Sequence, residues 1–158
     1  MSLQIIRTNS SNPDFQKLVI ELDKVLAFLD GEQHGFFAQF NKIDAIQHVL
    51  VAYVNNEAVG CGAIKQYEEG LAEIKRMYVD ENYRGKGFAG AILLELENWA
   101  RELNFQTCIL ETGYKQERAV GLYKKSNYTI IPNYGQYKDV KESICFEKKL
   151  VSINLMEA

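Results

Sequence analysis

The sequence has few of the residues from which metal sites and disulfide frameworks are built. It contains two histidines, His34 and His48, and three cysteines among 158 residues. Cys61, Cys108 and Cys145 all stand in apolar, strand-like runs, and no two of them have C-x-x-C spacing. An odd number of such cysteines indicates small buried side chains in a reducing compartment. We therefore expect no disulfide framework and no metal site.

The sequence also lacks a long apolar run and an excess of basic residues. The first seven residues have no basic start followed by a long apolar segment, so we expect neither a signal peptide nor a transmembrane span. The formal net charge is −3, whereas nonspecific nucleic-acid binding requires a basic face. These absences predict a cytoplasmic protein that binds neither nucleic acid nor membrane.

The remaining composition is that of an ordinary globular protein, with 47% hydrophobic and 25% charged residues. The length predicts one domain, which we place at residues 1–150, followed by a short tail at 151–158. Turn signals and period-two patterns predict an antiparallel meander of three strands. A strand, a helix and a further strand then form a parallel crossover, and the next helix is expected to begin at Thr112-Gly113. The expected strands are 3–8, 48–54, 59–67, 71–79, 106–111, 128–131 and 143–150, with a helix from Asn12-Pro13 to Asp30 and a short one within 32–41.

The stretch from Leu71 to Leu103 carries the main functional signal. A strand-like run is followed by R-G-K-G-F-A-G at residues 84–90, and an apolar-periodic helix begins directly behind it. The first N–H groups of a helix have no internal partner, and the macrodipole adds positive charge there. Glycines allow close backbone approach, while Arg84 and Lys86 add full charges. This segment therefore predicts a site for a phosphate-bearing ligand.

Two other interpretations of the loop at residues 84–90 fit its context less well. Residues 85–90 match G-x-G-x-x-G, the dinucleotide fingerprint, and Glu111 stands near the spacing of its ribose acid. In that fingerprint the strand leads directly into the first glycine, whereas here Asp80 to Arg84 intervene, and the preceding residues predict antiparallel hairpins. The alternative of a turn that only reverses the chain explains neither the two cations nor the helix behind it.

The pattern Arg84-x-x-Gly87-x-Ala89 resembles motif A of the GCN5-related N-acetyltransferases, the GNAT superfamily. With the strand-like run before it and Leu122-Tyr-Lys-Lys125 after it, the resemblance extends from about residue 49 to 150. It implies an α/β (α+β) fold with a mixed, mostly antiparallel sheet of about seven strands and about four helices, splayed near the cofactor. Asn127 stands where the family usually has glycine, but asparagine also tolerates the left-handed conformation.

The resemblance implies acetyl-CoA as cosubstrate and no metal. The loop would hold the pyrophosphate, while the backbone before it would pair with the pantetheine arm as an added strand. Gln116 takes the place of an asparagine that commonly contacts pantetheine in the family. The implied cofactor-binding residues are Met77, Tyr78, Val79, Arg84, Gly85, Lys86, Gly87, Phe88, Ala89 and Gln116.

Two residues match catalytic positions of the family. Tyr123 matches the tyrosine that serves many members as general acid toward the thiolate, and its alternative is a core tyrosine on an amphipathic helix. Glu73 matches the general base of the histone-acetylating branch. The alternative is a structural glutamate hydrogen-bonded inside the fold, because other branches of the family use an ordered water or different residues as the base. The match does not transfer the histone substrate.

Candidate acceptor contacts are aromatic. Phe36 or Phe37 follows the first helix, in a segment that often lines the acceptor pocket in this fold, although clustered aromatics are commonly core. Tyr134 or Tyr137 lies in the connection 132–139, which is expected to border the same pocket. The predicted function is therefore acetyl transfer from acetyl-CoA to a primary amine of a small molecule or peptide, directly in a ternary complex, by a monomer or homodimer. The alternatives are a noncatalytic acyl-CoA sensor module and a dinucleotide-binding module.

Overall fold

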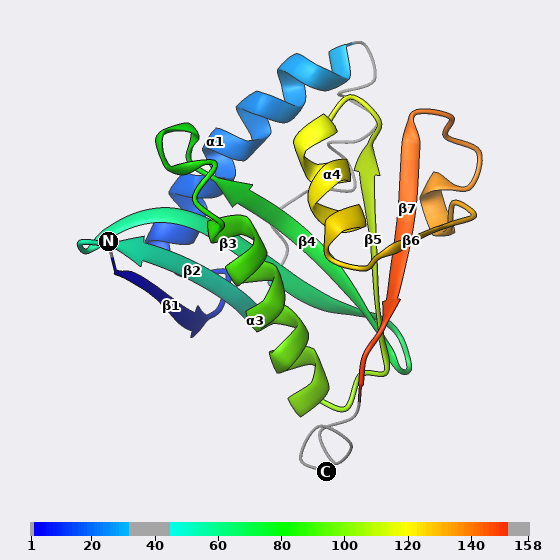
Figure 1. Ribbon diagram of the computed structural model, residues 1–158, viewed down its shortest axis with the longest axis horizontal. Coiled ribbons are helices and arrows are strands. Elements are labelled where there is room, and N and C mark those ends of the chain that lie inside the picture. Colours follow the sequence, from blue (N-terminus) through cyan, green and yellow to red (C-terminus); the bar gives the residue numbers. More distant parts are fainter. Residues whose placement is uncertain (1, 32–44, 152–158) are drawn as a thin grey trace. The chain divides into compact units, whose positions relative to one another are not determined.

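The computed structural model describes residues 2–31 and 45–151 (Figure 1). The chain divides into two compact units. The first unit comprises the chain up to Lys65 and Ile74–Leu96, and the second comprises Gln66–Glu73 and the chain from Glu97 onward. The expected short helix within 32–41, with Phe36 and Phe37, lies outside the described residues. A single domain over 1–150 stays a prediction.

Seven strands form one sheet in the order β1-β2-β3-β4-β5-β7-β6. The β4–β5 pairing is parallel, whereas β1–β2, β2–β3, β5–β7 and β6–β7 are antiparallel, so the predicted mixed seven-stranded fold is confirmed. The elements are β1 (Leu3–Thr8), α1 (Pro13–Asp30), β2 (His48–Val54), β3 (Glu57–Glu68), β4 (Leu71–Val79), the 3₁₀ turn η2 (Glu81–Tyr83), α3 (Phe88–Glu102), β5 (Thr107–Gly113), α4 (Glu117–Lys125), β6 (Thr129–Ile131), the 3₁₀ turn η3 (Gly135–Tyr137) and β7 (Ser143–Lys149).

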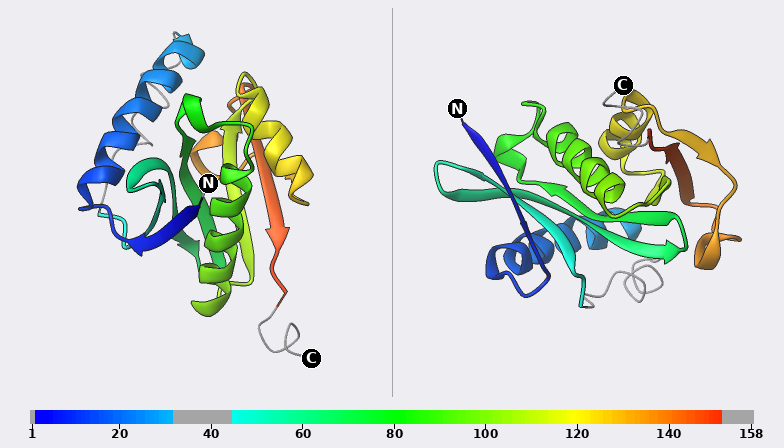
Figure 2. Two further views of the ribbon diagram at one scale, coloured as in Figure 1. Left: turned by 60° about the vertical axis from the view of Figure 1, so that its left-hand side comes forward. Right: turned by 90° about the horizontal axis from the view of Figure 1, so that it is seen from below.

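In the first unit, α1 and the beginning of α3 cover opposite faces of β1–β3 (Figure 2). Helix α1 begins as its sequence dictates, because the Asn12 side chain accepts hydrogen bonds from the Asp14 and Phe15 amides at 2.8 and 3.1 Å. Its apolar stripe then packs on one face of β2 and β3. The buried cluster there comprises Phe15, Leu18, Val19, Ile46, Val49, Val51, Cys61 and Ala63.

Two glycines of β3 explain how α3 seats on the other face. Successive strand residues alternate between faces, so Gly60 and Gly62 face α3 while Cys61 faces α1. A Cβ at Gly62 would lie 2.7 Å from Met77 Sδ and 2.9 Å from Leu96 Cδ1. The helix that begins behind the glycine-rich loop therefore lies directly against the strand backbone.

In the second unit, β5 and β7 pair along their whole length, from Thr107↔Lys149 to Gly113↔Ser143 (Figure 1). The parallel pairing of β4 with β5 is shorter and covers Leu71–Glu73 opposite Thr107–Ile109. The expectation that Thr112-Gly113 begins the next helix is wrong. Strand β5 continues to Gly113, a turn closes with Gln116 N donating to Gly113 O at 3.0 Å, and α4 begins at Glu117.

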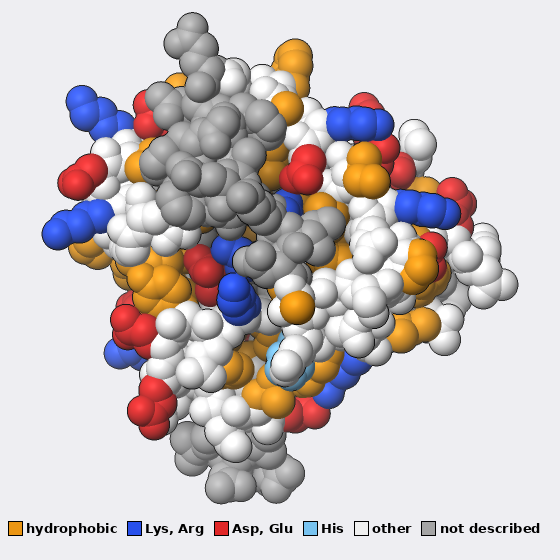
Figure 3. Space-filling model, turned by 180° about the vertical axis from the view of Figure 1, so that it is seen from behind, with side chains coloured by type: hydrophobic (Ala, Val, Ile, Leu, Met, Phe, Trp, Pro, Cys, Tyr) orange, Lys and Arg blue, Asp and Glu red, His pale blue; other side chains and the backbone are white. Residues whose placement is uncertain are grey.

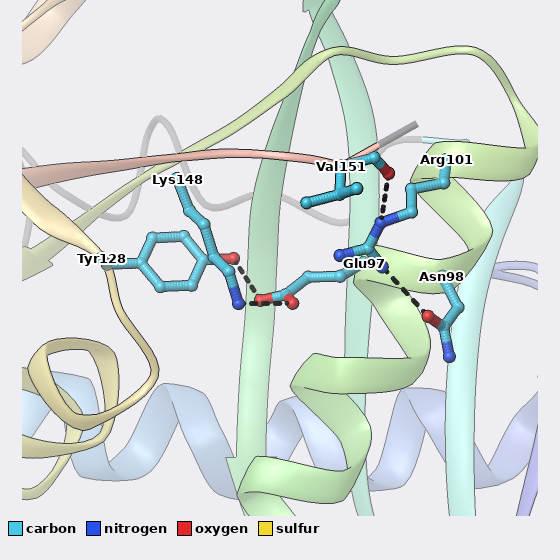
Figure 4. Close-up of polar contacts among 6 residues, drawn as sticks. All are labelled: Glu97, Asn98, Arg101, Tyr128, Lys148 and Val151. Atoms are coloured by element: carbon cyan, nitrogen blue, oxygen red, sulfur yellow. Dashed lines mark hydrogen bonds and ion pairs between the residues drawn. The ribbon is translucent and has the colours of Figure 1, made fainter. Parts of the chain in front are cut away.

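Within the second unit, a buried carboxylate near the end of α3 is held by residues far from it in the sequence (Figure 4). Glu97, 1% exposed, receives a hydrogen bond from the Tyr128 hydroxyl at 2.9 Å and pairs with Lys148 Nζ at 2.8 Å. One turn later, Arg101 Nε donates to the Val151 carbonyl at 2.9 Å. Each oxygen of the buried carboxylate is thus compensated, as a buried charge requires. We therefore interpret the hydrogen bonds and the ion pair around Glu97 as structural.

The surface carries both signs of charge. On the face shown in Figure 3, basic and acidic side chains are interspersed among the described residues. None of the helices in residues 2–31 and 45–151 is long and apolar enough to cross a membrane.

The residue that follows the end of α4 has the backbone conformation expected from the sequence. Asn127 has a φ of 71°, so it adopts the left-handed conformation.

Candidate active site

The glycine-rich loop is mounted firmly at its start. Asp80 N donates to the Val59 carbonyl at 2.8 Å, and Asp80 Oδ1 accepts from Asn82 N at 2.9 Å, which closes η2. Arg84 Nε then donates to the Val79 carbonyl at 2.9 Å, and its guanidinium lies 5.8 Å from the centre of the Tyr78 ring. The end of β4 and the start of the loop therefore keep a fixed relation within the first unit.

The loop itself exposes the backbone of its glycines. Gly85 and Gly87 have φ values of 77° and 82°, which other residues adopt only with strain, and a Cβ at either position would meet nothing within 4 Å. The Ala91 amide donates to the Gly87 carbonyl at 3.1 Å as α3 begins at Phe88. The amides before Ala91 thus precede the first helical hydrogen bond, beside exposed Lys86. Open backbone, unpaired helical amides and a cation fit a phosphate-bearing ligand.

Strand β4 has an irregular backbone just before this loop. Arg76 has a φ of 59° within the strand, and its carbonyl accepts a hydrogen bond from Cys61 Sγ at 3.3 Å. Its guanidinium is buried, with Nη1 2.8 Å from Asp23 Oδ1 on α1 and Nη2 without a hydrogen-bond partner. The sequence showed a charged residue in an apolar strand, but not its left-handed conformation. Met77 and Tyr78 follow it half-buried, and Val79 is buried.

In the second unit, the expected base has a specific partner. Glu73, 7% exposed, lies at the end of the parallel β4–β5 pairing. The Tyr134 hydroxyl donates to Glu73 Oε2 at 2.6 Å, although the two residues are 61 positions apart. A bond this short between a hydroxyl and a carboxylate is typical of a charge-assisted hydrogen bond. The structure thus brings together two of the residues singled out from the sequence.

Three tyrosines pack together around this hydrogen bond. The Tyr134 ring meets Tyr67 edge-on at 5.1 Å and Tyr137 edge-on at 5.9 Å between centroids. Gly135, with a φ of 52°, leaves room for Tyr67, because a Cβ there would lie 2.7 Å from the Tyr67 hydroxyl. Tyr67 was not identified from the sequence, where it is simply the aromatic residue near a strand end. Tyr137 is 2% exposed, and its substrate contact stays a prediction.

The expected general acid lies deep in the second unit. Tyr123, on α4, is 5% exposed, and its ring is 5.8 Å from those of both Tyr128 and Phe146. Burial, reinforced by the charge of Glu111, raises the pKa of the Tyr123 hydroxyl above its ordinary value. The phenol therefore keeps its proton throughout the neutral range and can act as a donor. Its catalytic role stays a prediction, as does the alternative of a core tyrosine.

A second carboxylate stands beside this group. Glu111, on β5, accepts a hydrogen bond from the Ser143 hydroxyl at 2.6 Å. In the parallel register Glu73 lies opposite Ile109, so Glu111, two residues further along, projects from the same face of β5 as Ile109. Gln116 is half-buried at the start of α4. The sequence suggested Glu111 only through the dinucleotide fingerprint.

The expected site residues are divided between the two units. The first unit holds the loop at residues 84–90 together with Met77, Tyr78 and Val79. The second unit holds Glu73, Gln116, Tyr123, Tyr134 and Tyr137. Among residues 2–31 and 45–151, no group of three or more histidine, cysteine, aspartate or glutamate side chains could hold a metal ion. The arrangement can therefore offer an anion site in one unit and a proton acceptor with tyrosine donors in the other.

Comparisons with known proteins agree with this architecture. Residues 15–128 match the Acetyltransferase (GNAT) family. An IAA acetyltransferase of Azospirillum brasilense is 32% identical over 85% of this chain and 89% of its own length. A proposed acyl-CoA N-acyltransferase of Klebsiella pneumoniae is similar in structure, with a TM-score of 0.80, 28% identity and coverage of 94% and 98% of the two chains. The PaiA N-acetyltransferase of Thermoplasma acidophilum, solved with coenzyme A, has a TM-score of 0.68 at 17% identity, over 94% and 99%. The chain belongs to the acetyltransferase (GNAT) family.

Proposed function

We propose that this protein is an acetyl-CoA-dependent N-acetyltransferase whose acceptor is a primary amine of a small molecule or peptide. Transfer would be direct, in a ternary complex of protein, acetyl-CoA and amine. The observation that carries the proposal is the loop at residues 84–90, where open glycines at positive φ precede a helix start. Membership of the family and the coenzyme A complex of the Thermoplasma neighbour support the same cosubstrate.

The first requirement of the reaction is a grip on the cosubstrate. The amides from Gly85 to Ala89 would donate to the pyrophosphate, because helix-terminal N–H groups and the macrodipole favour an anion there. Arg84 is tied to the Val79 carbonyl through Nε, so it would shape the loop as well as add charge. The backbone of 77–79 would run beside the pantetheine arm, and Gln116 would contact it.

The second requirement is a neutral amine. An alkylammonium group has a pKa of about 10.4, so roughly one molecule in 10³ is nucleophilic at neutral pH. Glu73 would take this proton, either directly or through a water molecule. The amine lone pair then attacks the thioester carbonyl, the C–S bond breaks, and the nitrogen gives up a second proton, which balances the proton that the thiolate gains.

The third requirement is protonation of the departing sulfur. Tyr123 would donate a hydrogen bond to the thiolate, for which its hydroxyl must remain protonated. The raised pKa of Tyr123 satisfies that condition at neutral pH. In this assignment Tyr123 and Glu73 act at opposite ends of the reaction, one on the leaving group and one on the nucleophile.

Amine-dependent release of coenzyme A tests the proposal. The purified protein is mixed with acetyl-CoA and one candidate acceptor in each reaction. The acceptors are amines, polyamines, amino acids, peptides and IAA, the compound in the name of the Azospirillum relative. Free thiol is measured with and without acceptor. Thiol release that depends on an amine supports the enzyme, whereas binding of acetyl-CoA without turnover for any acceptor favours a sensor module. Thermal shifts with coenzyme A and with NAD distinguish both from a dinucleotide-binding module.

A further inference from the structure

We infer that Tyr134 is a positioning residue for Glu73, whose carboxylate it holds in one orientation by donating a hydrogen bond from its hydroxyl. This inference rests on the proposed function, in which Glu73 takes the proton of the acceptor amine. It differs from the role expected from the sequence, in which Tyr134 touches the substrate. It also gives the connection between β6 and β7 a part in proton transfer.

The geometry of the hydrogen bond carries the inference. Tyr134 Oη lies 2.6 Å from Glu73 Oε2, and the glutamate is 7% exposed. A hydroxyl-to-carboxylate bond of this length is charge-assisted and roughly twice as strong as a neutral one. Because a buried carboxylate depends on such donors, the tyrosine stabilises the ionised form that a general base requires.

The Tyr134 ring is itself held in place, so the bond is preorganised. Tyr67 packs against it edge-on, and so does Tyr137, which is almost completely buried. The backbone is fixed on either side, because Asn133 Nδ2 donates to the carbonyls of Val140 and Ser143 at 2.9 and 3.1 Å. Packing already restricts the Tyr134 side chain to few rotamers, so little conformational entropy is lost when it holds Glu73. This restriction distinguishes a positioning residue from a side chain that only touches Glu73 transiently.

The direction of the hydrogen bond is settled by the state of the phenol. Burial, followed by the charge of Glu73 and the hydrogen bond to it, raises the pKa of Tyr134 above its ordinary value. Tyr134 therefore stays protonated near neutral pH and donates. The other titratable groups that face this pair are Tyr67 on β3, Tyr137 in η3, Cys145 on β7 and Glu111 on β5.

The proton transfer balances with Tyr134 unchanged. The ammonium N–H bond breaks, an O–H bond forms on Glu73, and the amine keeps the electron pair with which it attacks the thioester. Tyr134 retains its own proton throughout. Removing its hydroxyl should therefore leave the base present but harder to ionise, and the defect should disappear once the pH is high enough.

The variant that tests this is Tyr134→Phe, with Tyr67→Phe as its matched control. Both substitutions remove one hydroxyl and keep the aromatic ring of the same cluster. Carboxyl ¹³C NMR at pH 7 detects the Glu73 carboxylate, whose resonance is assigned by its loss in Glu73→Gln. Because the carboxylate loses its hydrogen bond from the hydroxyl, this resonance should move in Tyr134→Phe. In Tyr67→Phe it should stay close to that of the parent protein.

Kinetics provide the second measurement once an acceptor is known. In Tyr134→Phe the acidic limb of the pH profile of kcat/KM should move to higher pH, with little change in KM for the amine. An unchanged carboxyl resonance and limb, or a raised KM with an unmoved limb, would overturn the inference. If the resonance moves while no amine is acetylated, the positioning role stands and the proposed function is what fails.

Discussion

The loop at residues 84–90 and the tyrosine cluster of Tyr67, Tyr134 and Tyr137 differ in how the chain builds them. The loop is one contiguous stretch, and its chemistry comes from backbone amides and two glycines at positive φ. The cluster gathers side chains from β3 and from the connection after β6, and it serves a glutamate on β4. The anion site consists of consecutive residues, whereas the proton-transfer site consists of residues far apart in the sequence that the fold brings together.

The largest expected effect is the loss of coenzyme A binding after a substitution in the loop at residues 84–90. Gly87→Glu should abolish binding of coenzyme A, because a carboxylate would occupy the position of the pyrophosphate and repel it. The protein should still fold, since a Cβ at Gly87 meets nothing within 4 Å, although the φ of 82° adds strain of about 1–2 kcal/mol. Calorimetry with coenzyme A measures the loss.

Gly87→Gln is the matched control for that substitution. It has the same backbone strain and nearly the same size without the charge, so it should weaken binding less than the glutamate does. Equal affinity for coenzyme A in the parent and in Gly87→Glu would place the phosphate site elsewhere.

The contrast between the regions also explains what could be predicted from the sequence. The loop followed from its glycines and cations, and the parallel crossover followed from a strand, a helix and a strand in succession, because both depend on neighbouring residues. The start of α4 was misplaced, since Gly113 suggested a helix start but β7 pairs with β5 as far as that residue. Propensity at a strand end yields to tertiary pairing.

Side-chain partnerships were predictable only in part. The sequence supplied Glu73 and Tyr134 as separate candidates, and nothing in it showed that they share a hydrogen bond 61 positions apart. Tyr67 and the left-handed Arg76 were missed for the same reason, because packing partners and backbone strain arise from distant contacts. A charged residue in an apolar strand is the one signal that could have indicated Arg76.

The next effect concerns the second unit. Tyr123→Phe should lower kcat by about 10² to 10⁴, the usual range for a general acid, with the affinity for acetyl-CoA nearly intact. Raising the pH should not restore the rate, because the defect lies in the leaving group, whereas a more acidic thiol should. Steady-state kinetics with two thioesters measure this. Full activity combined with easier unfolding would assign Tyr123 to core packing with Tyr128 and Phe146.

The activity lost in Glu73→Gln should depend on pH, unlike that lost in Tyr123→Phe. It should lose most of its activity at pH 7, on the order of 10²-fold for a general base, and regain part of it at higher pH, where solvent supplies the neutral amine. The test is a pair of pH–rate profiles for Glu73→Gln and Tyr123→Phe. A loss in Glu73→Gln that does not change with pH would remove the glutamate from proton transfer and leave it a structural residue.

A smaller effect is expected on stability, at one glycine that packs against α3 in the first unit and one glycine on α4 in the second. Gly62→Ala should lower the free energy of unfolding by about 1–3 kcal/mol, because its Cβ would lie within 3.0 Å of Met77, Leu96 and Ile92. Gly121→Ala, on α4, is the control: its Cβ meets nothing within 4 Å, so helix propensity should raise stability by up to about 1 kcal/mol. Urea unfolding of both variants measures the difference, and equal stabilities would mean that α3 can move away from β3.

The smallest effect distinguishes the buried thiols of the two units. Burial raises the pKa of Cys61 in the first unit to about 12 and that of Cys145, beside Tyr134, to about 11. A thiol whose pKa is raised by folding stabilises the protein below its unfolded pKa, and this contribution is lost as the pH rises through the folded value. Each thiol should therefore cost about 1.4 kcal/mol per pH unit above pH 9, for Cys145 only as far as about pH 11. Urea unfolding from pH 7 to 10 should show a shallower decline in Cys145→Ala than in the parent, and identical slopes would mean that Cys145 ionises as easily in the folded protein as in the unfolded chain.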